Sequence, residues 1–221
     1  MPPRGGRRSV RSNPSPEPLP LAFYDRPAEV VARALLGCVV VSEVGGERVA
    51  GEIVETEAYV GPDDEASHAH RRFGVTRRNA VMYGEPGVAY VYRIYGMHWC
   101  LNAVTGEKGH PAAILIRAAR PVAGLDAARA RRPGRPDRDL LRGPANLCRA
   151  MAIDGTLNGH ALDRAPLWIE RGATVPDRDV AAGPRVGISR AVDLPLRFWL
   201  RGSEFVSGRV PREPSTPSST P

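Results

Sequence analysis

Lysine, cysteine and long apolar runs are all scarce in this chain of 221 residues. Lysine occurs once, at Lys108, among 31 basic residues. Cys38, Cys100 and Cys148 stand far apart among apolar neighbours, which argues against a disulfide framework or a CxxC metal site and predicts buried thiols. No stretch approaches the ~20 apolar residues of a membrane span, and the basic N-terminus lacks the apolar run of a secretory signal. We therefore expect a cytoplasmic protein with no membrane segment.

Arginine supplies nearly all of the positive charge. The net charge is +7 and the isoelectric point lies near 9.9, a balance that favours a polyanionic partner. A GC-rich genome explains the ratio of arginine to lysine equally well, but it does not explain the net positive charge. With 42% apolar residues, the chain is long enough for one domain with its own core, and two full domains would be crowded.

The two ends of the chain differ in composition from its centre. Residues 1–20 contain six prolines, two glycines and four arginines, with almost nothing to bury. Residues 209–221 repeat this bias with proline, serine and threonine. Such segments cannot bury enough apolar surface to offset the entropy of ordering. We expect both ends to be disordered and residues 21–208 to form the folded domain.

The centre of the chain alternates strand patterns with a few helical ones. A helix is predicted from Asp25, a suitable cap, to Gly37, with its apolar stripe at Val30, Val31, Ala34 and Leu35. Gly45-Gly46 predicts a tight hairpin between strand runs 38–44 and 48–59. Further strands are expected at 88–95, 99–104, 112–118, 167–170, 185–189 and 196–200, and further helices at 125–132 and after Gly143-Pro144. Because βαβ alternation is lacking, we predict an α+β (mixed α/β) fold, a single compact domain around a curved, mainly antiparallel β-sheet with flanking helices.

One predicted strand carries two carboxylates on a single face. Side chains alternate along a strand, so Glu55, Glu57 and Tyr59 point the same way. Two carboxylates held close together can divide acid and base roles, because like charges push their pKa values apart. Most such pairs are nevertheless a solvated strand face. The strand is followed by a long polar loop, 61–83, which contains His68 and four arginines. Loops of this length are often functional, so the loop strengthens the argument that this strand face has a function.

His68 and His70 form an HxH pattern, and Asp63 and Glu65 lie just upstream. One hypothesis is therefore a metal-dependent hydrolase that binds its metal with Glu65, His68 and His70. The pattern lacks the ordered third and fourth ligands of known zinc and iron sites. A histidine beside aromatic residues can instead stack on a ring or donate a hydrogen bond. We therefore predict no metal and no other cofactor.

Three tyrosines and one asparagine can be explained either by packing within the fold or by contact with a ligand. Tyr90 and Tyr92 share one strand face, which is typical of cross-strand packing. Tyr95 precedes Gly96, where the chain can turn sharply, so its ring can project from a hairpin tip in the way that wedges between base pairs do. Asn102 lies in an apolar strand and must find partners, which are either backbone groups or the edge of a ligand.

A series of ordered blocks closely resembles the alkyladenine (3-methyladenine) DNA glycosylase family, from about residue 23 to residue 208. The blocks are Glu55-Thr56-Glu57-Ala58-Tyr59, Gly61-Pro62, Asp64-Glu65-Ala66-Ser67-His68, Thr76-Arg77-Arg78-Asn79, Gly87-Val88-Ala89-Tyr90-Val91-Tyr92, Tyr95-Gly96-Met97, Leu101-Asn102, Leu115-Ile116-Arg117-Ala118, Gly143-Pro144 and Pro195-Leu196-Arg197-Phe198. The resemblance implies a compact domain around a curved antiparallel sheet. It also implies hydrolysis of the bond between a damaged purine and deoxyribose in double-stranded DNA, by a monomeric enzyme associated with the nucleoid if the source is bacterial.

The resemblance also implies a role for each residue of the site. Glu57 matches the general base, and Arg117 matches a residue that helps to hold the attacking water and a phosphate. The rings that enclose the flipped base match Tyr59, His68 and Tyr92. Tyr95 matches the residue that fills the vacated space in the duplex, Asn102 matches the amide that disfavours the 2-amino group of guanine, and the DNA backbone is expected to contact Arg77, Arg78, Arg142 and Gly143.

Two departures from the family pattern and one alternative accompany this interpretation. Met97-His98-Trp99 replaces the usual aromatic pair, and Asn146 stands where a lysine is common after Gly-Pro. The arginines between residues 131 and 142 offer compensation for that lost charge. Since Lys108 lies outside every matching block, a Schiff-base lyase is disfavoured and a monofunctional enzyme is expected. The alternative is a non-catalytic nucleic-acid-binding module of the same fold, which would not need Glu57.

Overall fold

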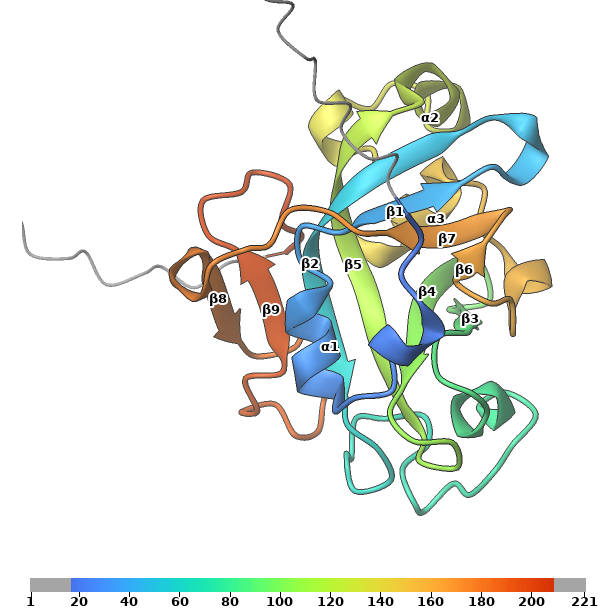
Figure 1. Ribbon diagram of the computed structural model, residues 1–221, viewed down its shortest axis with the longest axis vertical. Coiled ribbons are helices and arrows are strands. Elements are labelled where there is room, and N and C mark those ends of the chain that lie inside the picture. Colours follow the sequence, from blue (N-terminus) through green and yellow to red (C-terminus); the bar gives the residue numbers. More distant parts are fainter. Residues whose placement is uncertain (1–16, 209–221) are drawn as a thin grey trace, which may run out of the picture.

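The computed structural model describes residues 17–208, which form one domain around a curved antiparallel sheet (Figure 1). The helices of this part are α1 (Ala28–Ala34), α2 (Leu125–Arg131) and α3 (Pro144–Ala150). The strands are β1 (Val39–Ser42), β2 (Val49–Tyr59), β3 (Ala89–Ile94), β4 (His98–Thr105), β5 (Ala112–Ala123), β6 (Asp163–Arg164), β7 (Leu167–Glu170), β8 (Val180–Gly183) and β9 (Arg197–Leu200). The strand order is β3-β4-β5-β2-β1-β7-β6, with β9 paired to β2 and β8 paired to β9. The predicted α+β class and antiparallel sheet are confirmed.

Strand β2 occupies the centre of this sheet. It pairs with β5 along one edge, while on its other edge it pairs first with β1 and then, over Glu55 to Glu57, with β9. The β2–β5 ladder shifts register on either side of Glu55, and such irregularities bend a strand and increase its twist. The change of partner leaves the second half of β2 covered on both edges, so its side chains are enclosed rather than solvated.

Helix α1 packs against β2 and β5, and α3 packs against β4 and β5. The buried residues of α1 are Ala28, Val31 and Ala32, and Leu35 follows them at the spacing of one helix face. The predicted stripe is therefore wrong at Val30, whose side chain is 46% exposed. The predicted cap at Asp25 is also wrong, because the helix begins after Pro27, without a side-chain cap.

Most of the other predicted elements are confirmed, including the antiparallel pairing of β1 with β2. The tight two-residue hairpin at Gly45-Gly46 is wrong, because the last pair is Ser42–Val49 and the chain between them passes through a 3₁₀ turn at Val44–Gly46. The strand predicted at 185–189 is wrong. That segment is irregular, and the backbone N–H of Val186 donates to the carboxylate of Glu57 instead of to a neighbouring strand. The edge strand β8, just before it, was not predicted.

The domain begins earlier than the predicted boundary at residue 21. Leu19 is fully buried, and its backbone N–H donates to the carbonyl of Ile169 at 2.7 Å. The prediction of a disordered arm is therefore wrong for residues 17–20, because Leu19 does have a core to enter. Residues 1–16 and 209–221, the remainder of the predicted disordered ends, lie outside the described residues.

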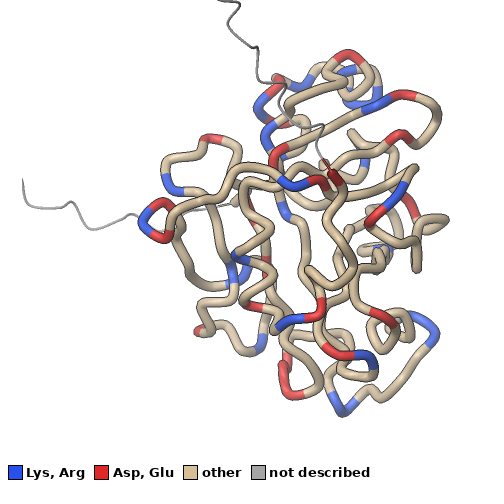
Figure 2. The backbone as a smooth tube through the Cα atoms, in the orientation of Figure 1, with Lys and Arg blue, Asp and Glu red and all other residues tan. Residues whose placement is uncertain are grey.

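The predicted state of the cysteines is confirmed, since Cys38, Cys100 and Cys148 are buried and free. Within residues 17–208, no helix has both the length and the apolarity to cross a membrane. Acidic and basic residues lie close together over much of the described backbone (Figure 2), so in this view the positive charge does not gather on one continuous face.

Candidate active site

Glu55 and Glu57 point to the same side of β2, as predicted, and both side chains are fully buried. They share one partner. Arg117, on β5, approaches Glu55 Oε1 with Nε at 2.9 Å and Glu57 Oε1 with Nη1 at 3.1 Å. Burial disfavours the charge of Arg117, but Glu57 and Glu55 outweigh this effect and raise its pKa. The pair is therefore not a solvated strand face.

Three groups of the protein contact the carboxylate of Glu57. Arg117 and the backbone N–H of Val186, which lies 2.6 Å away, reach Oε1. The hydroxyl of Tyr59 donates to Oε2 at 3.0 Å. Burial, and then the charge of Glu57, hold the pKa of Tyr59 well above its usual value, so the phenol remains a donor. The three contacts fix the carboxylate of Glu57 in one orientation.

Glu55 has a different environment from Glu57. Its carboxylate accepts from Arg117, from Arg197 Nε at 2.7 Å and from the backbone N–H of Ser207 at 2.6 Å. Two buried guanidinium groups are thus balanced by two buried carboxylates, which keeps the charge of the group near zero. Glu55 thus anchors Arg117 and Arg197.

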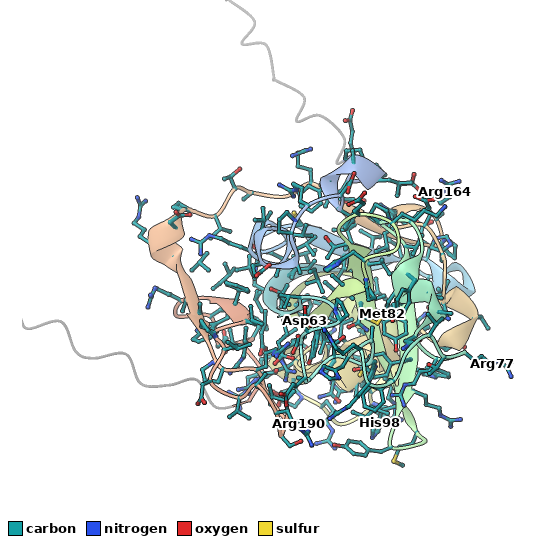
Figure 3. All side chains as sticks on the ribbon, turned by 90° about the horizontal axis from the view of Figure 1, so that it is seen from below. Asp63, Arg77, Met82, His98, Arg164 and Arg190 are labelled. Atoms are coloured by element: carbon teal, nitrogen blue, oxygen red, sulfur yellow. The ribbon has the colours of Figure 1, made fainter. Side chains whose placement is uncertain are left out.

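A cavity of about 480 Å³ opens beside this cluster. The predicted residues on its wall are Tyr59, His68, Tyr92, Tyr95, Asn102 and Arg117. Glu57 itself is not on the wall, but all three of its partners are. In Figure 3 the labelled residues Arg190 and His98 lie along one edge of the molecule, and Met82, which is on the cavity wall, lies further inside.

His68 and the two predicted tyrosines of β3 form one aromatic group. The ring of His68 meets that of Tyr92 edge to face, with centroids 4.5 Å apart. Its Nδ1 lies 3.0 Å from the hydroxyl of Tyr90. Burial, and then the charge of Arg78, lower the pKa of His68 to about 4, so the imidazole is neutral at pH 7. Tyr90 is therefore more than a cross-strand packing residue, because it orients His68.

Asn102 is buried in β4, and its Nδ2 donates to the carbonyl of Tyr90 at 3.0 Å. The backbone carbonyl of Tyr90 is thus one of the partners that the sequence predicted for this amide. On the other side the amide lines the cavity. Both partners that the sequence left open, a backbone group and the edge of a ligand, are thus available to this one side chain.

Tyr95 lies at the turn between β3 and β4 and is 85% exposed. Its φ of 50° and that of Gly96, 68°, reverse the chain within two residues, which projects the ring from the hairpin tip as predicted. Met97 beside it is also exposed. An exposed aromatic ring on the wall of a cavity is suited to contact another molecule.

The four residues predicted to contact a DNA backbone lie in different surroundings. Arg78 stands over the Tyr92 ring at 5.1 Å and donates to the carbonyl of Arg93. Arg77 is exposed and extends outward, away from Met82 (Figure 3). Arg142 donates to the carbonyl of Val206 at 2.8 Å. Gly143 is the N-cap residue of α3, and the next residue, Pro144, lies on the cavity wall.

The sequence did not single out a buried ion pair between Asp64 and Arg185. Both side chains are fully buried, and Arg185 Nη2 lies 2.8 Å from Asp64 Oδ1. Arg185 also donates to the carbonyl of Ala58 and lies over the ring of Tyr59 at 4.7 Å. The next residue is Val186, whose N–H bonds Glu57. No pattern in the sequence links positions 64 and 185, which are brought together only by the fold.

His68 and His70 have different neighbours, since His70 packs near Phe73. Among residues 17–208, no three His, Cys, Asp or Glu side chains converge as they would around a metal ion. The HxH pattern therefore gains no third ligand from the fold.

The sequence of this chain is similar to that of known proteins over most of its length. Residues 22–204 match the family described as methylpurine-DNA glycosylase. A protein of Carboxydothermus hydrogenoformans is 48% identical over 190 residues, which cover 86% of this chain and 98% of the relative. A protein of Burkholderia cenocepacia is 47% identical, covering 93% and 99%. Both relatives are named, provisionally, as 3-methyladenine DNA glycosylases. On this similarity, the chain belongs to the methylpurine-DNA glycosylase family.

Proposed function

We propose that the chain is a monofunctional DNA glycosylase of base excision repair, which rotates a damaged purine out of duplex DNA and hydrolyses its N-glycosidic bond. The substrates are alkylated or deaminated purines of the 3-methyladenine, 7-methylguanine and hypoxanthine type, and the enzyme acts as a monomer. The observation that carries the proposal is Glu57, a buried carboxylate held by three groups of an aromatic cavity. Membership of the family supplies the reaction class.

Glu57 is suited to activate water. A carboxylate offers about four positions for hydrogen bonds, and three are filled by Tyr59, Arg117 and Val186, which leaves room for about one more donor. A water in that position loses a proton to Glu57 as it attacks the sugar. Departure of the purine builds positive charge on the sugar, which the same carboxylate stabilises, as in glycoside hydrolysis.

The aromatic wall is suited to alkylated purines. Many of these carry a positive charge, and electron-rich rings such as those of Tyr59 and Tyr92 favour a cation by ~0.5–2 kcal/mol. His68 supports this preference because its lowered pKa keeps it uncharged, so it does not repel a cationic base. The amide of Asn102 stands on the cavity wall, where we assign it the rejection of guanine through the 2-amino group.

Entry of a base into the cavity requires that it leave the duplex. Extrusion of a nucleotide costs a few kcal/mol, less for a damaged or mismatched pair. Tyr95, exposed at the hairpin tip, supplies a ring that fills the vacated space and slows the return of the base. We assign contacts with the DNA backbone to Arg77, Arg78, Arg142 and Gly143.

The reaction is assigned to water rather than to an amine of the protein. Lys108 is the only lysine of the chain. Its ammonium group lies 2.6 Å from Glu85, and the pair is exposed, away from the residues that line the cavity. No lysine is therefore available there to form a Schiff base.

Release of free base from defined duplexes tests this proposal. We expect purified protein to release hypoxanthine or 3-methyladenine from duplex DNA, to leave an intact strand with an abasic site, and to form no adduct that borohydride traps. An undamaged duplex of the same sequence is the control. Binding of lesion DNA without any release of base would support the non-catalytic module instead.

A further inference from the structure

A second cavity, of about 350 Å³, lies next to the cavity that we assign to the base. It is lined by Arg132, Arg135, Asp139, Arg142, Asn146, Ser207 and Gly208; we call it the arginine pocket. The two cavities share neighbours. Ser207 accepts a hydrogen bond from Arg117 Nη2 at 3.2 Å, and Arg117 is on the wall of the base cavity. Helix α3 contributes Pro144 to one cavity and Asn146 to the other.

Positive charge in the arginine pocket exceeds the negative charge available to balance it. Three guanidinium groups line the pocket with one carboxylate, that of Asp139, which lies 3.3 Å from Arg142. Arg132 is only 8% exposed, and the partners of its Nη1 are the carbonyls of Asp139 and Leu140. Burial, and then the charges of Arg135 and Arg149, lower the pKa of Arg132. A group of this kind is stabilised when an anion enters.

Several other arginines of the same region are balanced by carboxylates. Arg129 bonds both oxygens of Asp137 and also contacts Asp126. Within the described residues, Arg135 has no such partner, although it stands in the same arginine-rich turn. Arg138, three residues further on, also has no carboxylate partner in the described part of the chain, but it does not line the pocket. Arg135 is therefore the exposed arginine without such a partner that the pocket itself contributes.

We propose that the arginine pocket binds a phosphodiester group of the DNA strand that carries the damaged base, next to the flipped nucleotide. The inference rests on the proposed function. A nucleotide whose base occupies the first cavity has phosphates on both sides, and its own strand must leave along an adjacent surface. Phosphodiester oxygens accept paired hydrogen bonds from guanidinium groups. Arg135, exposed and without a carboxylate partner in the described part of the chain, is the residue that supplies the free donors.

The test combines a variant of the protein with neutral phosphates in the DNA. Arg135→Gln and the control Arg138→Gln, an exposed arginine three residues further on and not on the pocket wall, are compared with wild type. Each is titrated with lesion duplexes in which one phosphate at a time is a methylphosphonate. We expect Arg135→Gln to weaken binding about tenfold and to reduce the salt dependence by about one phosphate.

The expected signature is non-additivity at one position. One methylphosphonate beside the lesion should weaken binding by wild type and by Arg138→Gln, but not weaken binding by Arg135→Gln any further. The control Arg138→Gln should release base from the unmodified lesion duplex at the wild-type rate. Additive effects at every phosphate would overturn the proposal, and coupling only to the opposite strand would overturn the choice of strand. If wild type releases no base, the proposed function fails, while the coupling can still be read from binding.

Discussion

At the scale of single residues, the site depends on side chains whose protonation or orientation is set by a neighbour. Glu57 is oriented by three groups, His68 by the hydroxyl of Tyr90, and Asn102 by the carbonyl of Tyr90. Tyr90 thus fixes two residues of the cavity wall at once. Only the contact with His68 needs the tyrosine hydroxyl, because any residue at position 90 would supply the backbone carbonyl that Asn102 bonds.

The lowered pKa of His68 predicts a dependence of stability on pH. The unfolded chain takes up a proton on this histidine near its ordinary pKa of 6.5, whereas the folded chain does so only at about 4. Stability from the neutral ring is therefore present above pH 6.5 and is lost as the pH falls toward 4. Wild type should lose more unfolding free energy than His68→Asn between pH 7.5 and 5. NMR of the imidazole nitrogens should show His68 neutral at pH 5.5, and titration near 6.5 would contradict this prediction.

Asn102→Ser is predicted to relax selectivity. The shorter side chain removes the amide from the cavity wall and makes room for a 2-amino group, where rejection of guanine is worth roughly 1–3 kcal/mol. Guanine release from a mismatch should rise to a measurable rate, while release of hypoxanthine, which lacks that group, should change little. Single-turnover assays with the two paired substrates measure this. Unchanged guanine release together with collapse of hypoxanthine release would show that Asn102 is structural or catalytic instead.

At the scale of elements, the segment that follows β8 is held over the site by one ion pair. Asp64, in the loop after β2, binds Arg185, and Val186 then reaches Glu57. Asp64 also accepts from the backbone N–H groups of Val60 and Ala66. The loop that leaves β2 and the segment from 185 are therefore joined at the position where Tyr59 and Glu57 need support.

Asp64→Asn is predicted to destabilise the fold much more than Glu65→Gln. The first variant leaves the buried charge of Arg185 uncompensated, which costs ~3–5 kcal/mol of unfolding free energy. The second breaks an exposed pair with Arg190, for which the expected cost is at most ~1 kcal/mol. Urea unfolding of the two variants measures the difference. Equal losses would mean that the buried pair does not hold the segment in place.

The sequence predicted local features better than those that depend on distant contacts. The face of Glu55, Glu57 and Tyr59 follows from strand alternation, and the projection of Tyr95 follows from the glycine after it. The role of Arg185 could not be predicted, because its partner is 121 positions away along the chain. The strand wrongly predicted at 185–189 fails for the same reason, since its backbone bonds a carboxylate of another strand.

At the scale of the whole molecule, positive charge is spread among carboxylates and concentrated only locally. Many basic residues of the described region lie beside acidic residues (Figure 2). The arginine pocket is an exception, because three arginines line it with one carboxylate. Four further arginines, Arg4, Arg7, Arg8 and Arg11, lie in residues 1–16. They contribute to the net charge, but none of them belongs to the candidate active site.

Removal of residues 1–16 is predicted to weaken binding to long duplexes in a manner that depends on salt. Four arginines can release counterions from phosphates, and each contributes about 0.9 to the slope of log K against log salt. The truncation stops before Leu19, which belongs to the core, so folding and the rate of base release should be retained. Titrations at several salt concentrations compare the two proteins, and equal slopes would show that these arginines do not contact DNA.

The most direct test of the whole account is single-turnover release of hypoxanthine by Glu57→Gln. The substitution keeps the shape of the side chain and removes the base, so the variant should bind lesion DNA with an affinity close to that of wild type. Its rate of base release should be lower by at least ~10². Glu55 should not replace it, because Arg197 and Ser207, two of the partners of Glu55, are not on the cavity wall, whereas all three partners of Glu57 are. A rate within a few fold of wild type would contradict the account, because Glu57 would then not be the general base.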